Sequence, residues 1–148
     1  MLRVSLGITV TVFALSAIPV LAQQNPIVAR QELMKKSDDD LKLLSKMTRG
    51  EAPYDAGKVT AAYAAMEESY KKVRTLFPDD SKTGDNTRAM PKVWENRADF
   101  DAKMAEMVKV AGEAKAKALN EASFKEIHPA VVKACDNCHA DYRARRQR

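Results

Sequence analysis

Residues 56–77 read AGKVTAAYAAMEESYKKVRTLF, and this stretch shows the repeat that decides the fold class. Its apolar side chains return every three or four residues, which is the period of one face of an α-helix. The repeating positions are Val59, Ala62, Met66, Tyr70, Val73 and Phe77. Asp55 is a suitable N-cap, and Pro78 cannot continue the helix. The pattern therefore predicts an amphipathic helix from about Ala56 to Leu76.

The same period appears in the segments before and after this helix. A first helix is predicted from about Ile27 to Thr48, where Pro26 suits the first helical turn and Gly50 suits the position just after the end. A third is predicted from about Val93 to Leu119. Both segments carry apolar residues on one face and charged residues on the other, as expected for helices that cover a common core.

A last helix is predicted to begin after Ser123, as its N-cap, and to run to about Arg145. Pro129 lies inside it and is expected to kink the helix or to mark the start of its straight part. A long polar connection, residues 79–91, joins the second and third helices, whereas the other links are short. Because short links favour antiparallel neighbours, the sequence predicts an all-α, antiparallel four-helix bundle.

The first 22 residues have the layout of a secretory signal peptide. Arg3 gives a positive start, an apolar run covers residues 4–17, and Val20-Leu21-Ala22 suits a signal peptidase. The alternative, an uncleaved membrane anchor, needs a longer and less polar run than this one. We expect cleavage after Ala22, which leaves residues 23–148 as one domain in the periplasm, without a membrane attachment.

The chemistry of the chain is concentrated near its C-terminus, in Cys135-Asp136-Asn137-Cys138-His139. This is C-x-x-C-H, the attachment motif of c-type haem. Residues three apart on a helix share a face, so both sulfurs can reach the two vinyl groups of one porphyrin. His139 lies one step further round, where its imidazole can reach the iron. The motif therefore predicts one covalent haem c with His139 as the proximal iron ligand.

Three other chemistries use two cysteines at this spacing. A thioredoxin-like redox pair needs a neighbouring βαβ unit, and the sequence shows no strand pattern. A zinc site that includes His128 would have adjacent ligands at Cys138 and His139, which make a poor tetrahedron on one helical turn. A plain disulfide would leave His139 without a role. Haem attachment is the preferred interpretation, and it agrees with export because this attachment is made after export.

The chain carries a formal net charge of +5, from 25 Lys and Arg against 20 Asp and Glu. A mild basic excess can favour acidic partners or nucleic acid. Export argues against nucleic acid, and a solvated surface with spare lysines is the preferred interpretation of the charge. Redox partner proteins are expected only if the chain transfers electrons. Several basic residues near the C-terminus complement the negative end of the last helix and are candidates for steering an acidic partner. They are Arg143, Arg145, Arg146 and Arg148.

Several segments, taken in their order, carry a resemblance to a known family. They are Arg30-Gln31-Glu32-Leu33-Met34, Gly50-Glu51-Ala52-Pro53-Tyr54-Asp55, Leu76-Phe77-Pro78, Pro91-Lys92-Val93-Trp94, Ala98-Asp99-Phe100 and the terminal haem motif with Tyr142-Arg143. With these motifs the chain beyond the signal peptide resembles the class II c-type cytochromes, the cytochrome c-prime family, whereas class I cytochromes carry the haem motif near the N-terminus. The resemblance implies a four-helix bundle with the haem between helices, which agrees with the bundle predicted from the helical period.

The resemblance also implies which side chains contact the haem besides the motif. These are Arg30 and Gln31 near the haem propionates, Thr87, Arg88 and Ala89 at the haem edge, and Arg143 on the proximal side. Each has a plainer alternative: Arg30 as a solvated helix residue, Arg88 as part of a flexible loop, and Arg143 as a complement to the helix dipole.

Met34 stands where two functions of the family diverge. In its low-spin, cytochrome c-556-like branch, a methionine on the first helix is the sixth iron ligand, and Met ligation raises the potential of an electron carrier. In the five-coordinate branch, an apolar residue crowds the iron, nitric oxide or carbon monoxide binds there, and a methionine can occupy that position without ligating. A core methionine with no haem role is the plainer alternative. We favour electron transfer with Met34 as ligand, by a monomer or homodimer. No catalytic set emerges, so an enzyme is not expected.

Overall fold

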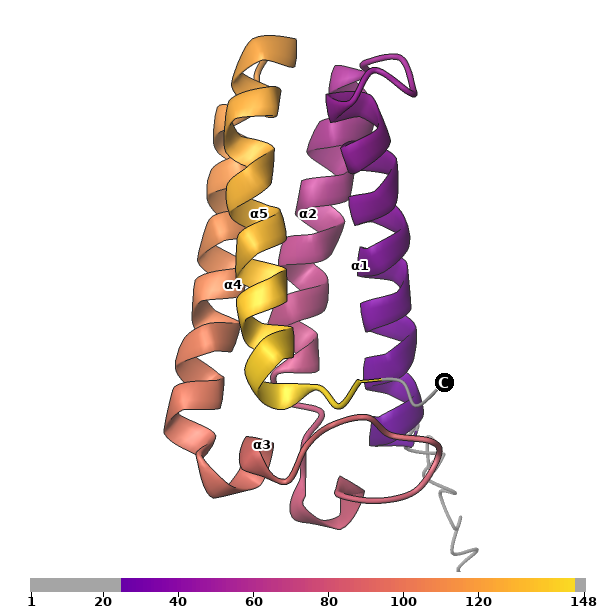
Figure 1. Ribbon diagram of the computed structural model, residues 1–148, viewed down its shortest axis with the longest axis vertical. Coiled ribbons are helices and arrows are strands. Elements are labelled where there is room, and N and C mark those ends of the chain that lie inside the picture. The colour runs from indigo at the N-terminus through magenta and orange to yellow at the C-terminus, as the bar shows by residue number, and fades with distance from the viewer. Residues whose placement is uncertain (1–24, 146–148) are drawn as a thin grey trace, which may run out of the picture.

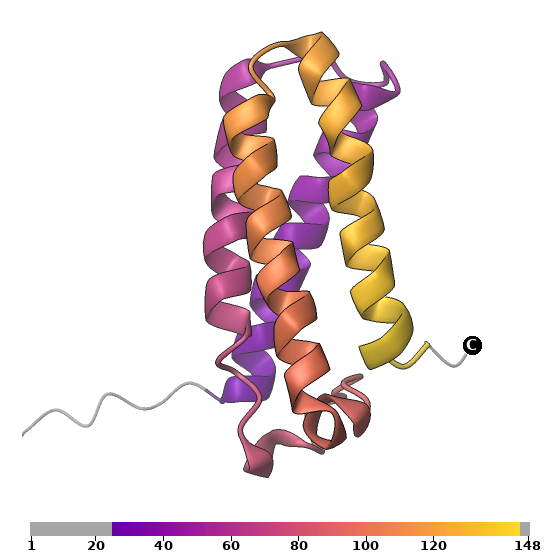
Figure 2. The ribbon, with the colours of Figure 1, turned by 90° about the vertical axis from the view of Figure 1, so that its left-hand side faces the viewer.

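Four long helices form an antiparallel bundle in residues 25–145, the part of the chain that the computed structural model describes (Figures 1 and 2). They are α1 (Pro26–Thr48), α2 (Ala56–Val73), α4 (Arg97–Lys117) and α5 (Glu121–Tyr142). Two short elements lie on the connection between α2 and α4: η1 (Asp79–Ser81), a 3-10 helix, and α3 (Lys92–Glu95). The predicted all-α bundle is confirmed, while the predicted signal peptide, residues 1–22, and Arg146 and Arg148 lie outside the described residues.

Helix α1 has well-defined ends that local chemistry explains. The Asn25 side chain accepts a hydrogen bond from the backbone N–H of Ile27 at 2.9 Å, and Pro26 occupies the first helical position as predicted. At the other end Gly50 has a φ of +75°, a left-handed conformation that favours glycine after a helix. These two caps fix where α1 starts and stops.

Helix α2 begins where the sequence predicts and ends slightly earlier. The Asp55 side chain accepts a hydrogen bond from the N–H of Lys58 at 2.9 Å, which confirms the predicted N-cap. The helix ends at Val73 rather than Leu76, because the N–H groups of Thr75 and Leu76 bond to carbonyls three residues earlier, at 3.1 and 2.9 Å. The last turn therefore tightens before Pro78.

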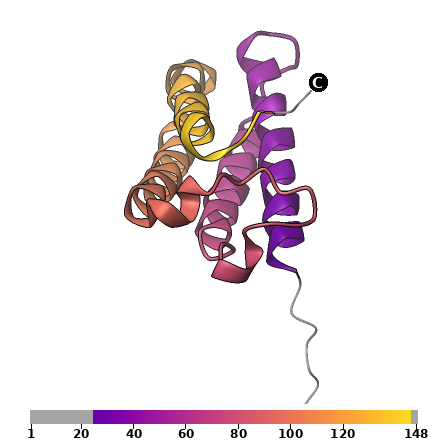
Figure 3. The ribbon, with the colours of Figure 1, turned by 60° about the horizontal axis from the view of Figure 1, so that its bottom comes forward.

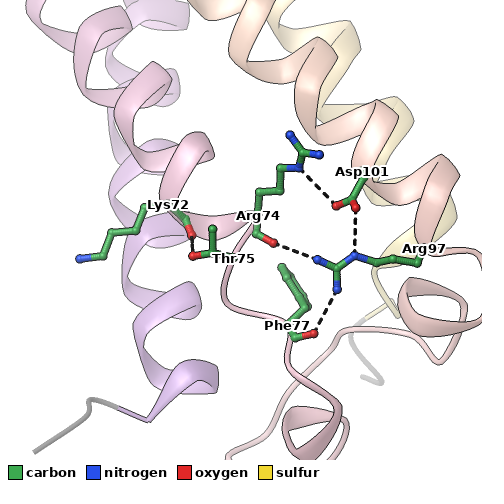
Figure 4. A network of polar contacts seen from close by, with 6 residues as sticks. All are labelled: Lys72, Arg74, Thr75, Phe77, Arg97 and Asp101. Atoms are coloured by element: carbon green, nitrogen blue, oxygen red, sulfur yellow. Dashed lines mark hydrogen bonds and ion pairs between the residues drawn. The ribbon is translucent and has the colours of Figure 1, made fainter.

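The predicted third helix, from Val93 to Leu119, is interrupted at Asn96 (φ −123°, ψ 56°), so α3 and α4 are separate elements. Trp94 donates from Nε1 to the carbonyl of Phe77 at 3.1 Å. Arg97 donates to the same carbonyl at 3.2 Å (Figure 4). These bonds hold α3 and the start of α4 against the segment that follows α2, and they offset the helical hydrogen bonds lost at the break. Asp101 fixes the Arg97 side chain from the next turn of α4, at 3.2 Å.

The start predicted for the last helix is wrong by one turn. Asn120, not Ser123, is the N-cap of α5: its side chain accepts from the N–H of Ser123 at 3.0 Å, while the Ser123 hydroxyl accepts from the N–H of Asn120 at 3.2 Å. This reciprocal capping box satisfies two backbone donors at once. The helix continues through Pro129 and ends at Tyr142 rather than Arg145, because Arg143 is extended and pairs with Ala89.

Apolar side chains from all four long helices fill the bundle. The methionines expected in the core are confirmed there, each no more than 4% exposed: Met47, Met66, Met104 and Met107. At the end where α5 finishes, the Phe100 ring packs edge-on against Phe77 and Tyr142, with ring centroids 4.8 and 5.2 Å apart. Among residues 25–145, no helix combines the length and apolarity needed to cross a membrane.

Candidate functional site

The cysteine motif lies in the last two turns of α5, beside the loop that follows α2 (Figure 1). Cys138 is 8% exposed and Cys135 is half-buried, and both are free thiols. The sulfur of Cys135 lies 3.8 Å from the hydroxyl of Tyr70, which comes from α2. Because the two cysteines are three residues apart on a continuous helix, their side chains share one face of α5.

Both thiols are held in the protonated form. Burial raises the pKa of Cys138 to about 11, and burial is also the main reason that the pKa of Cys135 is raised. Reactive and redox-active cysteines have lowered pKa values, because the thiolate is the nucleophile. The environment of Cys135 and Cys138 therefore differs from that of a thioredoxin-like pair.

His139 follows Cys138 and is half-buried. Burial, helped by the positive charge of Arg143, lowers the pKa of His139 to about 4. The imidazole is therefore neutral near pH 7, and the neutral ring is the form that donates a lone pair to a metal. One turn of α5 thus presents two sulfurs and one unprotonated ring nitrogen.

The facing side of this site comes from α1. The negative charge of Asp38 partly offsets the lowering of the His139 pKa, so Asp38 lies within electrostatic range of that ring. Met34 precedes Asp38 by one helical turn and shares its side of the helix. Its side chain is half-buried and packs against the core. Met34 therefore lies on α1, half-buried, one turn before a charge that acts on His139.

Arg30 organises the loop beside the site. Its side chain is 4% exposed, and its two terminal nitrogens make four hydrogen bonds. They donate to the carbonyl of Leu76, to the hydroxyl and carbonyl of Ser81 and to the hydroxyl of Thr87, at 2.8–2.9 Å. The plainer alternative, a solvated Arg30, is wrong: the guanidinium is buried and ties α1 to the loop.

The same loop is joined to the chain that leaves α5 (Figure 3). Ala89 and Arg143 form an antiparallel bridge, and the N–H of Ala144 donates to the carbonyl of Arg88 at 2.9 Å. At the start of α1, the side-chain amide of Gln31 donates to the carbonyl of Asp85 at 2.9 Å. The structure thus brings all six implied contact residues to one end of the bundle, around residues 79–91 and next to the cysteine motif.

Two residues of this region had no distinguishing signal in the sequence. Tyr70 is one of several apolar positions on α2, and only the packing of α2 against α5 brings its hydroxyl to Cys135. Ser81 is a serine in a polar loop, and only the fold buries it, at 1% exposure, as an acceptor for Arg30. Neither is marked by a local motif, since their partners lie far away in the sequence.

His128 belongs to a different part of the molecule. It is 3% exposed, and its ring nitrogens lie 2.9 Å from the hydroxyl of Ser45 and 3.0 Å from the hydroxyl of Tyr63. Both nitrogens are therefore committed to core hydrogen bonds rather than to the cysteines. Within residues 25–145, no group of three His, Cys, Asp or Glu side chains is arranged to hold a metal ion by itself.

Comparison with known proteins identifies the family of the chain. The family model described as Cytochrome C' matches residues 25–143. The chain is 37% identical over 126 residues to Cytochrome c' of Rhodopseudomonas palustris (85% of this chain, 86% of the relative) and 35% identical over 133 residues to Cytochrome c-556 of the same organism (87% and 89%). The solved structure of cytochrome c' from Rhodopseudomonas palustris aligns with a TM-score of 0.81 at 37% identity, covering 84% of this chain and all of the other.

A four-helix bundle with a C-x-x-C-H motif on its last helix defines a class II c-type cytochrome. The chain belongs to the cytochrome c' family. It is a monohaem electron-transfer protein whose cofactor is covalently bound haem c. The residues present fit that cofactor, because two free thiols and a neutral imidazole stand together on α5. When bound, haem c supplies a one-electron redox centre.

Proposed function

We propose that the chain is exported to the periplasm, loses residues 1–22 as a signal peptide, and carries single electrons between redox partner proteins. In the proposed site, Cys135 and Cys138 hold haem through thioether bonds, and His139 is the proximal iron ligand. Met34 is the distal ligand. The protein acts as a carrier rather than as an enzyme, as a monomer or homodimer.

The observation that carries this proposal is the chemistry of one turn of α5. Cys135 and Cys138 are un-ionised thiols on one face of the helix, and the pKa of the adjacent His139 is lowered to about 4 by burial. Because both sulfurs are free and share one face, each thiol can add its S–H across one vinyl group of a porphyrin, while the imidazole lone pair stays available to the iron. Covalent attachment keeps the cofactor with the chain outside the cytoplasm, where lost haem is not readily replaced.

Met34 supports electron transfer by its half-buried position on α1 and by its thioether group. It is half-buried against the core on α1, one turn before Asp38, whose charge acts on His139. A thioether has no proton to lose near neutral pH, so it serves as a ligand in both redox states. Ligation by His139 and Met34 together would fill both axial positions, raise the potential and leave no site for a gas.

The Arg30 cluster supports the proposed haem contacts at this end of the bundle. Arg30 is buried, donates to neutral oxygen atoms, and has its pKa lowered by that burial. A buried cation is stabilised by an anion nearby, and the haem propionates are such anions. Because the four terminal N–H groups of Arg30 already donate to protein oxygens, we propose that Arg30 acts on the propionates through its charge, with Gln31 beside it. The proposed contacts at the haem edge and on the proximal side are Thr87, Arg88, Ala89 and Arg143.

Absorption spectra of the purified protein, oxidised and reduced, test the assignment of Met34. The expected result is a low-spin, six-coordinate haem in both states, with slow or negligible binding of carbon monoxide. Met34→Leu should open the iron, shift the spectrum to high spin, lower the potential and admit carbon monoxide. Because this exchange nearly conserves volume, it should cost less than about 1.5 kcal/mol of stability.

Met47→Leu is the matched control. Met47 is on the same helix but near its C-terminal end, and its side chain is only 3% exposed. It should leave the spectrum and the carbon monoxide reaction unchanged. A high-spin spectrum with ready carbon monoxide binding in the unmutated protein would contradict ligation by Met34. That outcome would instead support the five-coordinate, gas-binding function.

A further inference from the structure

Asp40 is an unusual acid on α1. Its Oδ2 atom is buried and has no hydrogen-bond partner in the described part of the chain. The two acids before it are exposed and form ion pairs one turn away: Asp38 with Lys42 at 2.5 Å and Asp39 with Lys35 at 2.8 Å. Asp40 makes no such pair within residues 25–145. Of three consecutive aspartates, it alone presents a carboxylate oxygen to the interior.

The groups around Asp40 place it near the cysteine motif. From α2, Tyr70 faces it closely enough for the Asp40 charge to raise the tyrosine pKa, in addition to the larger effect of burial. The Tyr70 hydroxyl in turn lies 3.8 Å from the sulfur of Cys135 on α5. Ser37, one turn before Asp40, is 4% exposed, and its hydroxyl lies close enough to Tyr70 to lower the tyrosine pKa in part. A small set of polar groups therefore borders Cys135.

Burial, rather than the surrounding charges, is what favours the protonated form of the Asp40 carboxyl. Burial is the main cause that raises its pKa above the ordinary value, and the neighbouring charge of Asp39 raises it further. Lys36, one turn earlier on α1, opposes both effects only in part. On α5, Asp136 adds a negative charge that acts on Cys135. No cation from α2 or α5 is among the causes that act on the Asp40 pKa.

We propose that Asp40 binds one proton when the protein is reduced, so that the chain carries a proton together with its electron. The inference rests on the proposed attachment of haem at Cys135. An electron from the redox partner removes one positive charge from the iron site, and the nearby carboxylate loses that stabilisation. The Asp40 carboxylate then takes one proton from solvent and becomes a carboxylic acid. On oxidation, the electron leaves to the next partner and the proton returns to solvent.

The midpoint potential measured between pH 4 and pH 9 tests this coupling. Because the reduced protein binds the proton more tightly, the potential should be higher on an acidic plateau and lower on an alkaline one. We expect about a tenfold difference in proton affinity between the two redox states, which corresponds to about 59 mV for one electron. Asp40→Asn, which keeps the shape but cannot ionise, should remove this step. Asp40→Glu should restore it.

Asp39→Asn is the matched control, since Asp39 is adjacent but exposed and paired with Lys35; its profile should follow the unmutated protein. Infrared spectra of the reduced protein minus the oxidised protein give a second readout. The carbonyl stretch of a protonated carboxyl should appear on reduction, shift in Asp40→Glu and be absent in Asp40→Asn. These bands report on Asp40 itself, independently of any effect of the substitutions on stability.

Two results would overturn the inference alone: a haem-containing protein whose potential does not vary with pH, or a step that survives in Asp40→Asn. The second result would assign the proton to the haem propionates or to another group. A purified protein without covalent haem would overturn the proposed attachment at Cys135, and this inference with it.

Discussion

His128 and His139 lie on the same helix, α5, and burial lowers the pKa of both to about 4. By charge state they look alike, yet their surroundings separate them. His128 has hydroxyl partners at both ring nitrogens, Ser45 and Tyr63, deep in the core. His139 follows two free thiols and faces α1 and the loop of residues 79–91. The comparison shows that a neutral, buried histidine is a ligand candidate only when its lone pair is uncommitted.

The largest effect is expected at the cysteines that distinguish the His139 end of α5. Replacing both, as Cys135→Ala with Cys138→Ala, should remove covalent haem completely, because no thioether bond can form. The unmutated polypeptide should keep its haem through denaturing electrophoresis and acid–acetone extraction. If the extracted unmutated chain is colourless, Cys135 and Cys138 do not hold haem covalently, and the His139 end of α5 is not a haem site.

The two histidines can be compared directly by the same substitution. His139→Ala should leave haem attachment intact but remove the proximal ligand, and so should change the absorption spectrum strongly. His128→Ala should leave the spectrum nearly unchanged and should instead lower stability, because the hydroxyls of Ser45 and Tyr63 lose their partner in the core. Equal spectral changes in the two variants would mean that the wrong histidine has been assigned to the iron.

The lowered pKa of His128 should make the free energy of unfolding depend on pH. Its pKa is lowered from 6.5 to about 4 in the folded chain, so the unfolded chain binds more protons between these values. Stability should therefore fall as pH falls from 6.5 to 4, by about 3 kcal/mol in total from this group. Urea unfolding at a series of pH values measures the loss. His128→Gln should flatten the profile in this window, and an unchanged profile would assign the loss to other groups.

The smallest effect is expected beyond the end of α5. If the basic residues after His139 steer an acidic partner, association should slow as salt rises, since the Debye length is about 8 Å at 0.15 M ionic strength. Neutralising Arg145 and Arg146 together should weaken that dependence. Lys125, on α5 near His128 and paired with Glu121, supplies a control at the other end of the helix. If the unmutated protein, the Arg145 and Arg146 variant and a variant neutralised at Lys125 all show the same dependence of association rate on salt, the tail does not steer a partner. Its basic residues would then act only on the helix dipole.

The helices themselves could be predicted because their causes are local. Apolar residues at a period of three and four, with Pro26, Gly50 and Asp55 at the boundaries, are enough to set α1 and most of α2. Two local signals were read incorrectly. Ser123 is a residue type that favours N-caps, but it is the third residue of the helix and closes a capping box that Asn120 begins; Asn96 carries no local sign of a break. That break depends on the bonds of Trp94 and Arg97 to the end of α2.

By itself, the sequence determined the four-helix class and the haem attachment motif, since both depend on spacings within a few residues. Only the tertiary structure decided which neutral histidine is committed to the core and which carboxylate of the 38–40 run is buried beside Tyr70. It also brought Arg30 together with its partners Ser81 and Thr87, which lie on the loop that follows α2. The physical reason is that hydrogen bonds and burial join residues distant in the chain, whose meeting is set by how the helices pack and not by any local pattern.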